Sequence, residues 1–391
     1  MALIFSTIRS TALRLIALTA AVAMLVSSCD SVIYDEEGDC EIHYRLRFRF
    51  EKNLLFTDAF SAHVHSVAVY AFRPDGTFAW MRADRGAHLA ANGYTMSLDG
   101  VPAGDYHLVA WCGMDNGWQG LDHPETFTLP ELIPDVSTEQ ELQCRMEREY
   151  KSLAKKETPG TRSDDDVVAY SNSDLWPLFH GMVEDVTIID PNSLEADGQT
   201  ITYNCDLVKN TNRVRVILQQ LSGEDIDVRD FTFRLEMDNG LMDFDNSLVG
   251  DETIVYEPHN MDVGFAGLDP DAFMAGPEGT QVSPSDYVPV QVAIADFAVA
   301  RLVEDRRSTL TIYNSEGGLV ARIPLIDYAL LVKDNYSYLD YIGHHMTNQD
   351  YLDREDTYTL TFFLDRQHKW GGARILINSW RVVIHDYNVG S

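Results

Sequence analysis

The sequence has few basic residues for its length. Its 391 residues include 30 lysines and arginines against 61 aspartates and glutamates, so the formal net charge is −31. A nucleic-acid partner requires a basic surface that neutralises phosphates, and this composition argues against one. We therefore expect no nucleic-acid partner and a surface that repels other acidic surfaces.

The sequence also lacks the common motifs of catalysis and metal binding. It contains no GxSxG nucleophile elbow, no P-loop and no dinucleotide-binding glycine pattern. No histidines occur at HExxH spacing, and the cysteines do not form the CxxC pairs of a zinc site. The sequence therefore predicts no catalytic residue, no metal site and no cofactor other than a covalent lipid, which is described next.

Long apolar runs are absent except near the N-terminus. Residues 15–26 are almost entirely apolar and follow two arginines, which is typical of a signal peptide and too short for a permanent membrane span. The run ends in Val26-Ser27-Ser28-Cys29, the pattern of aliphatic, small, small and Cys that a lipoprotein signal peptidase cleaves. We expect cleavage between Ser28 and Cys29, with acyl chains on the Cys29 thiol as a firm membrane anchor. The alternative is an ordinary secretory signal in which Cys29 has no role.

Cysteines are few, and the expected export of the chain determines whether they can form disulfides. Removal of residues 1–28 leaves four besides Cys29, namely Cys40, Cys112, Cys144 and Cys205. Export permits disulfides, and four thiols allow three pairings that the sequence does not separate. Free, buried thiols are the alternative.

The rest of the chain alternates between apolar and polar residues, as β-strands do. Residues 29–40 form an acidic tether, and residues 41–207 and 208–391 are predicted to be two β-sandwich domains in tandem. A short helix is expected in the second domain, around residues 326–334. Residues 151–174 are charged and are predicted to be a mobile loop. Strands are expected at 42–50, 64–72, 94–98, 106–112, 183–189, 200–207, 213–219, 231–237, 288–293, 309–313, 319–323, 357–364 and 375–385.

Three motifs together resemble a known family. The first is the turn Pro102-Ala103-Gly104-Asp105-Tyr106, similar to the PxGxY turn of transthyretin-like sandwiches, and the second is the pair of segments 175–181 and 208–218. The third joins residues 349–358 with residues 377–380. With the lipoprotein signal, they resemble the fimbrial anchor subunits of Bacteroidales, the lipoprotein members of the fimbrillin superfamily that build type V pili.

The resemblance implies transthyretin-like sandwiches and a place at the base of a fimbria. It implies an outer-membrane lipoprotein that holds the fimbria, limits its length and binds fimbrial stalk subunits by β-strand exchange. In stalk subunits of this superfamily an arginine-specific protease removes the first strand, and the C-terminal strand of a neighbour fills the groove by β-augmentation.

The first strand of this chain is expected to resist such removal. No arginine or lysine lies between Cys29 and Ile42, and Arg45, Arg47 and Arg49 fall inside the predicted strand. Other exposed candidates, Arg82, Arg85 and Arg162, are expected in later loops. An uncleaved first strand keeps the groove closed, which suits a subunit that ends growth.

The last predicted strand, 375–385, carries apolar residues on both faces, so it is expected to be central and buried. It is also the candidate strand for exchange, through Ile375, Ile377, Trp380, Val382 and Ile384. Two alternative functions remain open. One is a tip or accessory adhesin of the same fimbrial system. The other is a surface glycan-binding lipoprotein that uses Trp80, Trp111, Trp118 and Trp176.

Overall fold

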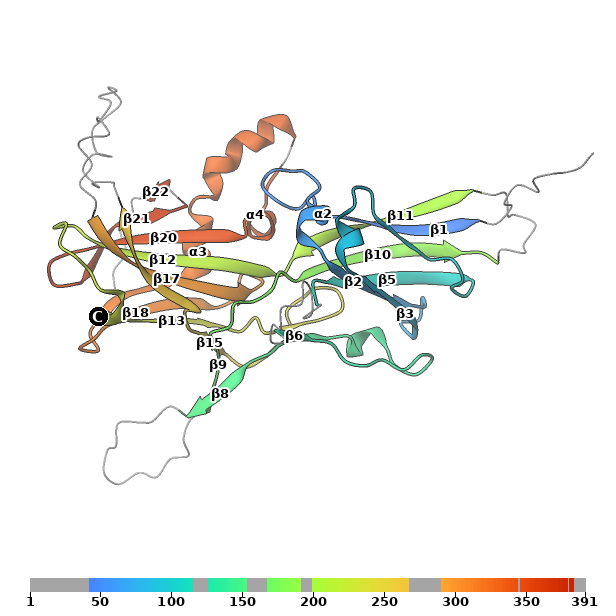
Figure 1. Cartoon of the computed structure of the whole chain (residues 1–391), viewed down its shortest axis with the longest axis horizontal. Helices are drawn as coiled ribbons and strands as arrows, with labels where there is room; N and C mark the ends of the chain where they lie inside the picture. The colour runs from blue at the N-terminus through green and yellow to red at the C-terminus, as the bar shows by residue number, and fades with distance from the viewer. Residues whose placement is uncertain are drawn as a thin grey trace, which may run out of the picture. The chain divides into compact units, whose positions relative to one another are not determined.

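In this computed structural model, the described part of the chain comprises residues 42–114, 126–152, 167–190, 199–266, 290–343, 345–378 and 380–382. The chain divides into two compact units, Met1–His43 with Asp190–Ile201 and Tyr44–Ile189 with Thr202–Ser391. Nearly all described residues lie in the second unit, which consists of β-sheets with a few short helices (Figure 1). The prediction of an all-β chain of sandwiches with a short helix in its second half is confirmed.

A seven-stranded sheet occupies the first half, in the order β3-β2-β5-β10-β11-β1-β4. Its strands are β1 (His43–Arg49), β2 (Ser66–Phe72), β3 (Phe78–Arg85), β4 (Thr95–Ser97), β5 (Gly104–Cys112), β10 (Phe179–Ile188) and β11 (Thr200–Lys209). Strand β1 alternates as predicted, because Tyr44, Leu46 and Phe48 are buried whereas Arg45 and Arg47 are exposed.

The edge strand β3 corrects one prediction. It contains Arg82 and Arg85, which were expected in a loop. The guanidinium of Arg82 donates to the carbonyl oxygens of Ser97 and Asp99, at the opposite edge of the same sheet. Arg82 therefore bridges the two edges of the seven-stranded sheet.

Two six-stranded sheets form most of the second half, and Figure 1 draws them one above the other. One has the order β16-β17-β12-β20-β21-β22, with β12 (Thr211–Gln220) parallel to β20 (Thr357–Leu364). The other has the order β19-β18-β13-β15-β9-β8. Apolar side chains of both sheets, such as Val216 and Leu235, belong to one buried core. The remaining strands are β13 (Phe231–Met237), β15 (Ile254–Tyr256), β16 (Asn260–Ala266), β17 (Val290–Ala300), β18 (Ser308–Asn314) and β19 (Leu319–Pro324).

Two strands of the second six-stranded sheet include residues of the segment predicted as a loop. Strands β8 (Glu149–Ser152) and β9 (Val167–Ser171) pair with each other, and β9 runs parallel to β15. The loop prediction is therefore wrong at these residues. Ala169 and Ser171 are buried on one face of β9, but the surrounding charged residues obscure this short alternation in the sequence. A small sheet, β14 (Leu241–Met242), β7 (Cys144–Met146) and β6 (Phe127–Thr128), also joins segments from both halves. The division at residue 207 remains a prediction.

Three helical segments lie between β19 and β20. They are α3 (Leu325–Leu330), the 3-10 helix η7 (Lys333–Ile342) and α4 (Asn348–Arg354). Helix α4 begins with a capping box, in which Thr347 Oγ1 accepts from Asp350 N and the Asp350 carboxylate accepts from Thr347 N. This cap fixes the start of α4, which lies inside the third sequence motif.

The C-terminal end differs from its prediction. Residues 375–385 do not form one central strand, because β21 (Trp370–Ile377) and β22 (Trp380–Val382) form an antiparallel hairpin. Asn378 makes the turn with a φ of 46°, a conformation that asparagine tolerates better than most residues. Its Oδ1 also accepts from Thr359 N at 2.7 Å. Strand β22 is consequently an edge strand of the described sheet.

Gly181 in β10 tests how closely β10 and β11 pack. A Cβ at this position would lie 2.6 Å from Cys205 Sγ and 2.8 Å from the carbonyl oxygen of Asp206. We expect Gly181→Ala to lower the free energy of unfolding by roughly 1–3 kcal/mol, because the added methyl must displace backbone. The control is Gly250→Ala, where nothing lies within 4 Å. Equal denaturation midpoints for the two variants would contradict this packing.

Candidate functional site

A buried carboxylate organises the third sequence motif. The Asp353 side chain, at the end of α4, is 1% exposed. Arg301 Nη2 lies 2.8 Å from Asp353 Oδ1 and 3.0 Å from Oδ2, and Lys52 Nζ lies 3.0 Å from Oδ2. Gln349 Nε2 donates to Oδ1 at 2.8 Å. A charged side chain removed from water requires such compensation, and these partners supply it to the Asp353 carboxylate.

The partners of Asp353 and its neighbours come from distant parts of the chain. Lys52 follows β1, whereas Arg301 follows β17 and also donates to the carbonyl oxygen of Asn246 at 2.8 Å. The next residue, Arg354, donates to the carbonyl oxygens of Glu51 and Asn53 at 3.0 and 3.1 Å. This group, which we call the Asp353 junction, therefore fastens the segment after β1 to α4 and β17.

A second buried contact joins the two halves near His180. The His180 imidazole is 4% exposed, and its Nε2 lies 2.7 Å from the carbonyl oxygen of Phe244. Burial lowers the pKa of His180 to about 4, so the ring is neutral at physiological pH. Nearby, the buried amides of Asn210 and Asn246 bond to each other at 2.6 and 3.1 Å. The second sequence motif thus contributes buried polar contacts to the same connection.

Glu355 links α4 to the C-terminal hairpin. Its carboxylate accepts from Asn378 Nδ2 at 3.1 Å, in the turn between β21 and β22, and from Thr357 N at 3.3 Å. Burial raises the pKa of Glu355 to about 7. The hairpin is therefore attached to a carboxyl group that changes charge near neutral pH.

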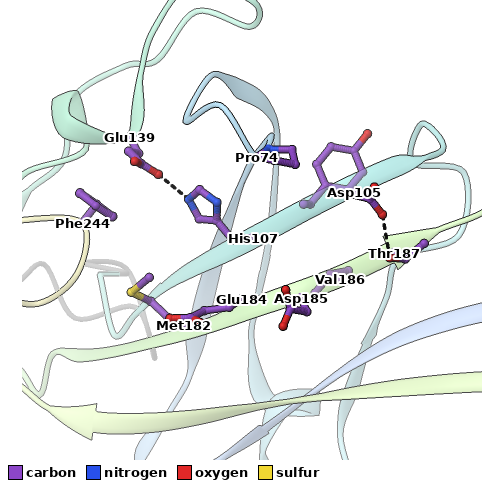
Figure 2. A pocket seen from close by; sticks show the side chains of 11 residues that line it. Pro74, Asp105, His107, Glu139, Met182, Glu184, Asp185, Val186, Thr187 and Phe244 are labelled. Carbon is purple, nitrogen blue, oxygen red and sulfur yellow. Dashed lines mark hydrogen bonds and ion pairs between the residues drawn. The ribbon is translucent and has the colours of Figure 1, made fainter.

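A pocket of about 370 Å³ opens beside β5 and β10 (Figure 2). His107 Nε2 lies 2.6 Å from Glu139 Oε2, and Thr187 Oγ1 donates to Asp105 at 2.7 Å. The register of β10 against β5 shifts between Val183 and Val186, and bulges of this kind redirect side chains. The acidic lining suits a group that donates hydrogen bonds. Among the described residues, no group of three or more His, Cys, Asp or Glu side chains is arranged to hold a metal ion.

Several predicted site residues lie outside the described residues. They are Ser28, Cys29, Cys40, Trp118, Arg162 and Ile384. Cys112, Cys144 and Cys205 are buried free thiols in the structure, and burial raises the pKa of each. No two of these three are joined to each other, and a disulfide that involves Cys40 remains a prediction.

The predicted exchange residues divide between two strands. Ile375 and Ile377 are buried in β21, whereas Trp380 and Val382 belong to β22. Trp111, a candidate for glycan contact, is fully buried, with its ring 4.7 Å from that of His180. In the part of the chain that is described, no helix has the length and apolar character needed to cross a bilayer.

Sequence reasoning missed the roles of Lys52, Arg301, Asp353 and the His107–Glu139 pair. The motif at residues 349–358 did single out the segment that contains Asp353. The sequence alone, however, does not show that this carboxylate is buried, and a charged residue is normally expected to be exposed to solvent. Lys52 has no distinguishing sequence signal, because its partner lies 301 positions later in the chain.

Comparison with known proteins identifies a matching family and relatives of similar sequence. A family model described as fimbrillin-A associated anchor proteins Mfa1 and Mfa2 matches residues 36–386. The chain is 24% identical over 240 residues to the minor fimbrium anchoring subunit Mfa2 of Porphyromonas gingivalis. That alignment covers 61% of this chain and 64% of the relative.

Solved structures share the fold. A putative adhesin of Bacteroides thetaiotaomicron matches with a TM-score of 0.67 and 26% identity, covering 90% of this chain and 100% of the other. The fimbrial anchor protein Mfa2 of Porphyromonas gingivalis matches with a TM-score of 0.57 and 17% identity, covering 88% and 100%. Because the family model spans most of the sequence, this chain belongs to the family of fimbrillin-A associated anchor proteins Mfa1 and Mfa2.

Proposed function

We propose that this chain is a non-enzymatic outer-membrane lipoprotein that anchors a fimbria at its base and limits its length. The match of the anchor-family model to residues 36–386 carries the proposal. The lipoprotein signal at Cys29 adds a means of attachment, and the relative in Porphyromonas gingivalis is named an anchoring subunit. The partners are fimbrial stalk subunits, joined by β-strand exchange.

The pairing of β1 supports a role in ending growth. Strand β1 lies between β11 and β4 in the seven-stranded sheet, and Arg45 and Arg47 are in register with Ser97 and Thr95 of β4. A protease needs an extended, accessible segment, whereas both edges of β1 are paired. With β1 in place, its groove cannot accept the strand of another subunit.

The C-terminal hairpin supports a role as strand donor. Strand β22 is three residues long and, among the described strands, pairs only with β21. Its release would break few main-chain hydrogen bonds, whereas Ile375 and Ile377 of β21 are buried in the core. We assign the exchange to the segment that contains Trp380, Val382 and Ile384, with β21 as its fixed base.

The Asp353 junction supports transmission of force between the two ends. The lipid on Cys29 would pull on β1, and the segment after β1 is held by Asp353 and Arg354 at the end of α4. Glu355 then connects this end of α4 to the turn of the hairpin. Tension between the membrane and the fimbria would thus cross a short series of buried polar contacts.

The alternatives predict different positions and ligands. A tip or accessory adhesin would be labelled by immunogold at the far end of the fibre, and an anchor at its base. A glycan-binding lipoprotein would bind on a glycan array, and the binding would weaken when Trp80 or Trp176 is replaced. Labelling at the base without glycan binding supports the anchor.

Lipidation is tested by Cys29→Ala. Without the thiol no acyl chain can be attached, so we expect the protein and its fimbriae to appear in the culture medium instead of the membrane fraction. Ser28→Ala keeps a small residue before the cleavage site and should leave attachment unchanged. Normal attached fibres in the Cys29→Ala strain would rule out this anchor.

Asp353→Ala tests the junction. Removal of the carboxylate leaves Arg301, whose side chain is 13% exposed, without its partner, so we expect a loss of about 3–5 kcal/mol in unfolding free energy. Arg229→Ala breaks a surface pair, with Arg229 86% exposed, and should leave the free energy of unfolding nearly unchanged because water screens that pair. Urea titrations of both variants give the comparison, and similar losses would show that Asp353 has no special role.

The raised pKa of Glu355 predicts that the stability of the fold depends on pH. Because burial raises its folded pKa to about 7 from 4.5, the folded state binds the extra proton, and stability falls as pH rises from 4.5 through 7. Glu355→Gln removes this loss and should gain about 2–3 kcal/mol over the native chain at pH 8, with little difference at pH 4. Glu131→Gln, at an exposed site, serves as control. A gain that is the same at both pH values would exclude this origin.

A further inference from the structure

One face of β1 carries three arginines, two of which have no acidic partner among the described residues. Arg45 and Arg47 are exposed, and among the described residues neither forms an ion pair or a side-chain hydrogen bond. Across the sheet they face Ser97 and Thr95 of β4, which are neutral. Arg49 continues the row and pairs with Asp206 of β11 at 2.7 Å. We call Arg45, Arg47 and Arg49 the β1 arginine row.

This row places local positive charge on a chain whose net charge is −31. Many other basic side chains are used in ion pairs, as Arg148 is with Asp251 at 2.7 Å and Lys209 with Asp356 at 2.5 Å. Charges more than about 8 Å apart are largely screened at physiological ionic strength. A ligand near β1 therefore meets the local positive charge rather than the net negative charge of the protein.

The position of the row in the chain indicates its partner. Strand β1 is the first described element after Cys29, and the 13 residues from there to Ile42 can reach at most about 45 Å. We propose that the β1 arginine row binds the phosphate-bearing headgroups of the leaflet that holds the acyl chains of Cys29. This inference rests on the proposed lipidation.

The contact would orient the anchor on the membrane. A lipid on a tether fixes one point and leaves rotation free, whereas a second, electrostatic contact selects the face of the sheet that meets the surface. Each arginine near an anionic surface contributes about fivefold to the population of the bound orientation. Arg45 and Arg47 together contribute about 25-fold. The five acids of residues 29–40 oppose the attraction, so both arginines are needed.

The test uses the full lipidated chain on vesicles. A donor dye is attached through Asn204→Cys, an exposed position two residues from Asp206 on the same face of β11, in a Cys40→Ser background. Acceptor dyes are placed on lipid headgroups, in vesicles of phosphatidylcholine with or without phosphatidylglycerol. We expect higher energy transfer with phosphatidylglycerol, and its loss at 0.5 M salt (roughly a 4 Å Debye length).

The double variant Arg45→Gln/Arg47→Gln should lose this increase. Arg229→Gln/Arg322→Gln removes the same charge from exposed positions elsewhere and should keep it. Vesicle flotation separates the two proposals. If the chain does not float with vesicles, lipidation fails and this inference fails with it. If it floats but transfer is independent of phosphatidylglycerol, or both double variants lose the increase, only the β1 arginine row is excluded.

Discussion

The Asp353 carboxylate is the central charged contact in the connection between the two halves, beside the buried contacts of His180 and of Asn210 with Asn246. It is almost fully removed from water, and Arg301, Lys52 and Gln349 compensate its charge from different parts of the chain. A buried ion pair contributes less to stability than its Coulomb energy suggests, because both ions lose hydration. Its main effect is to favour one packing arrangement, because any arrangement that separates these groups leaves a charge buried and unpaired. The short α4 therefore has one position relative to β1 and β17.

Several basic side chains of this acidic chain likewise lie at contacts between distant segments. Arg301 and Arg148 lie at buried joints, and Arg82 bridges the two edges of the seven-stranded sheet. Arg301 and Arg148 neutralise carboxylates that the fold buries, whereas Arg82 bonds main-chain carbonyl oxygens. Arg45 and Arg47 lie on the same exposed face of β1 and have no acidic partner among the described residues, so this face is a candidate for binding an anionic surface.

The two ends of the molecule have opposite characters. Strand β1 is paired on both sides, so its removal would disrupt a seven-stranded sheet, whereas β22 is a short edge strand held by a turn at Asn378. In the proposed function, the firmly paired β1 would bear the membrane attachment and the segment of β22 would engage a subunit. Glu355 adds a titratable group beside the C-terminal hairpin, where a change of charge near neutral pH alters the support of the turn.

The sequence by itself determined the strands with clear two-residue alternation, because that signal is local: β1, β13 and β20 lie where it predicted them. It also singled out residues 349–358. Only the tertiary structure decided the rest. It brought β8 and β9 into a sheet with β15, folded residues 375–382 into a hairpin, and joined Lys52 to Asp353. Burial of a charge and pairing across hundreds of residues depend on which surfaces meet, and no local pattern encodes that.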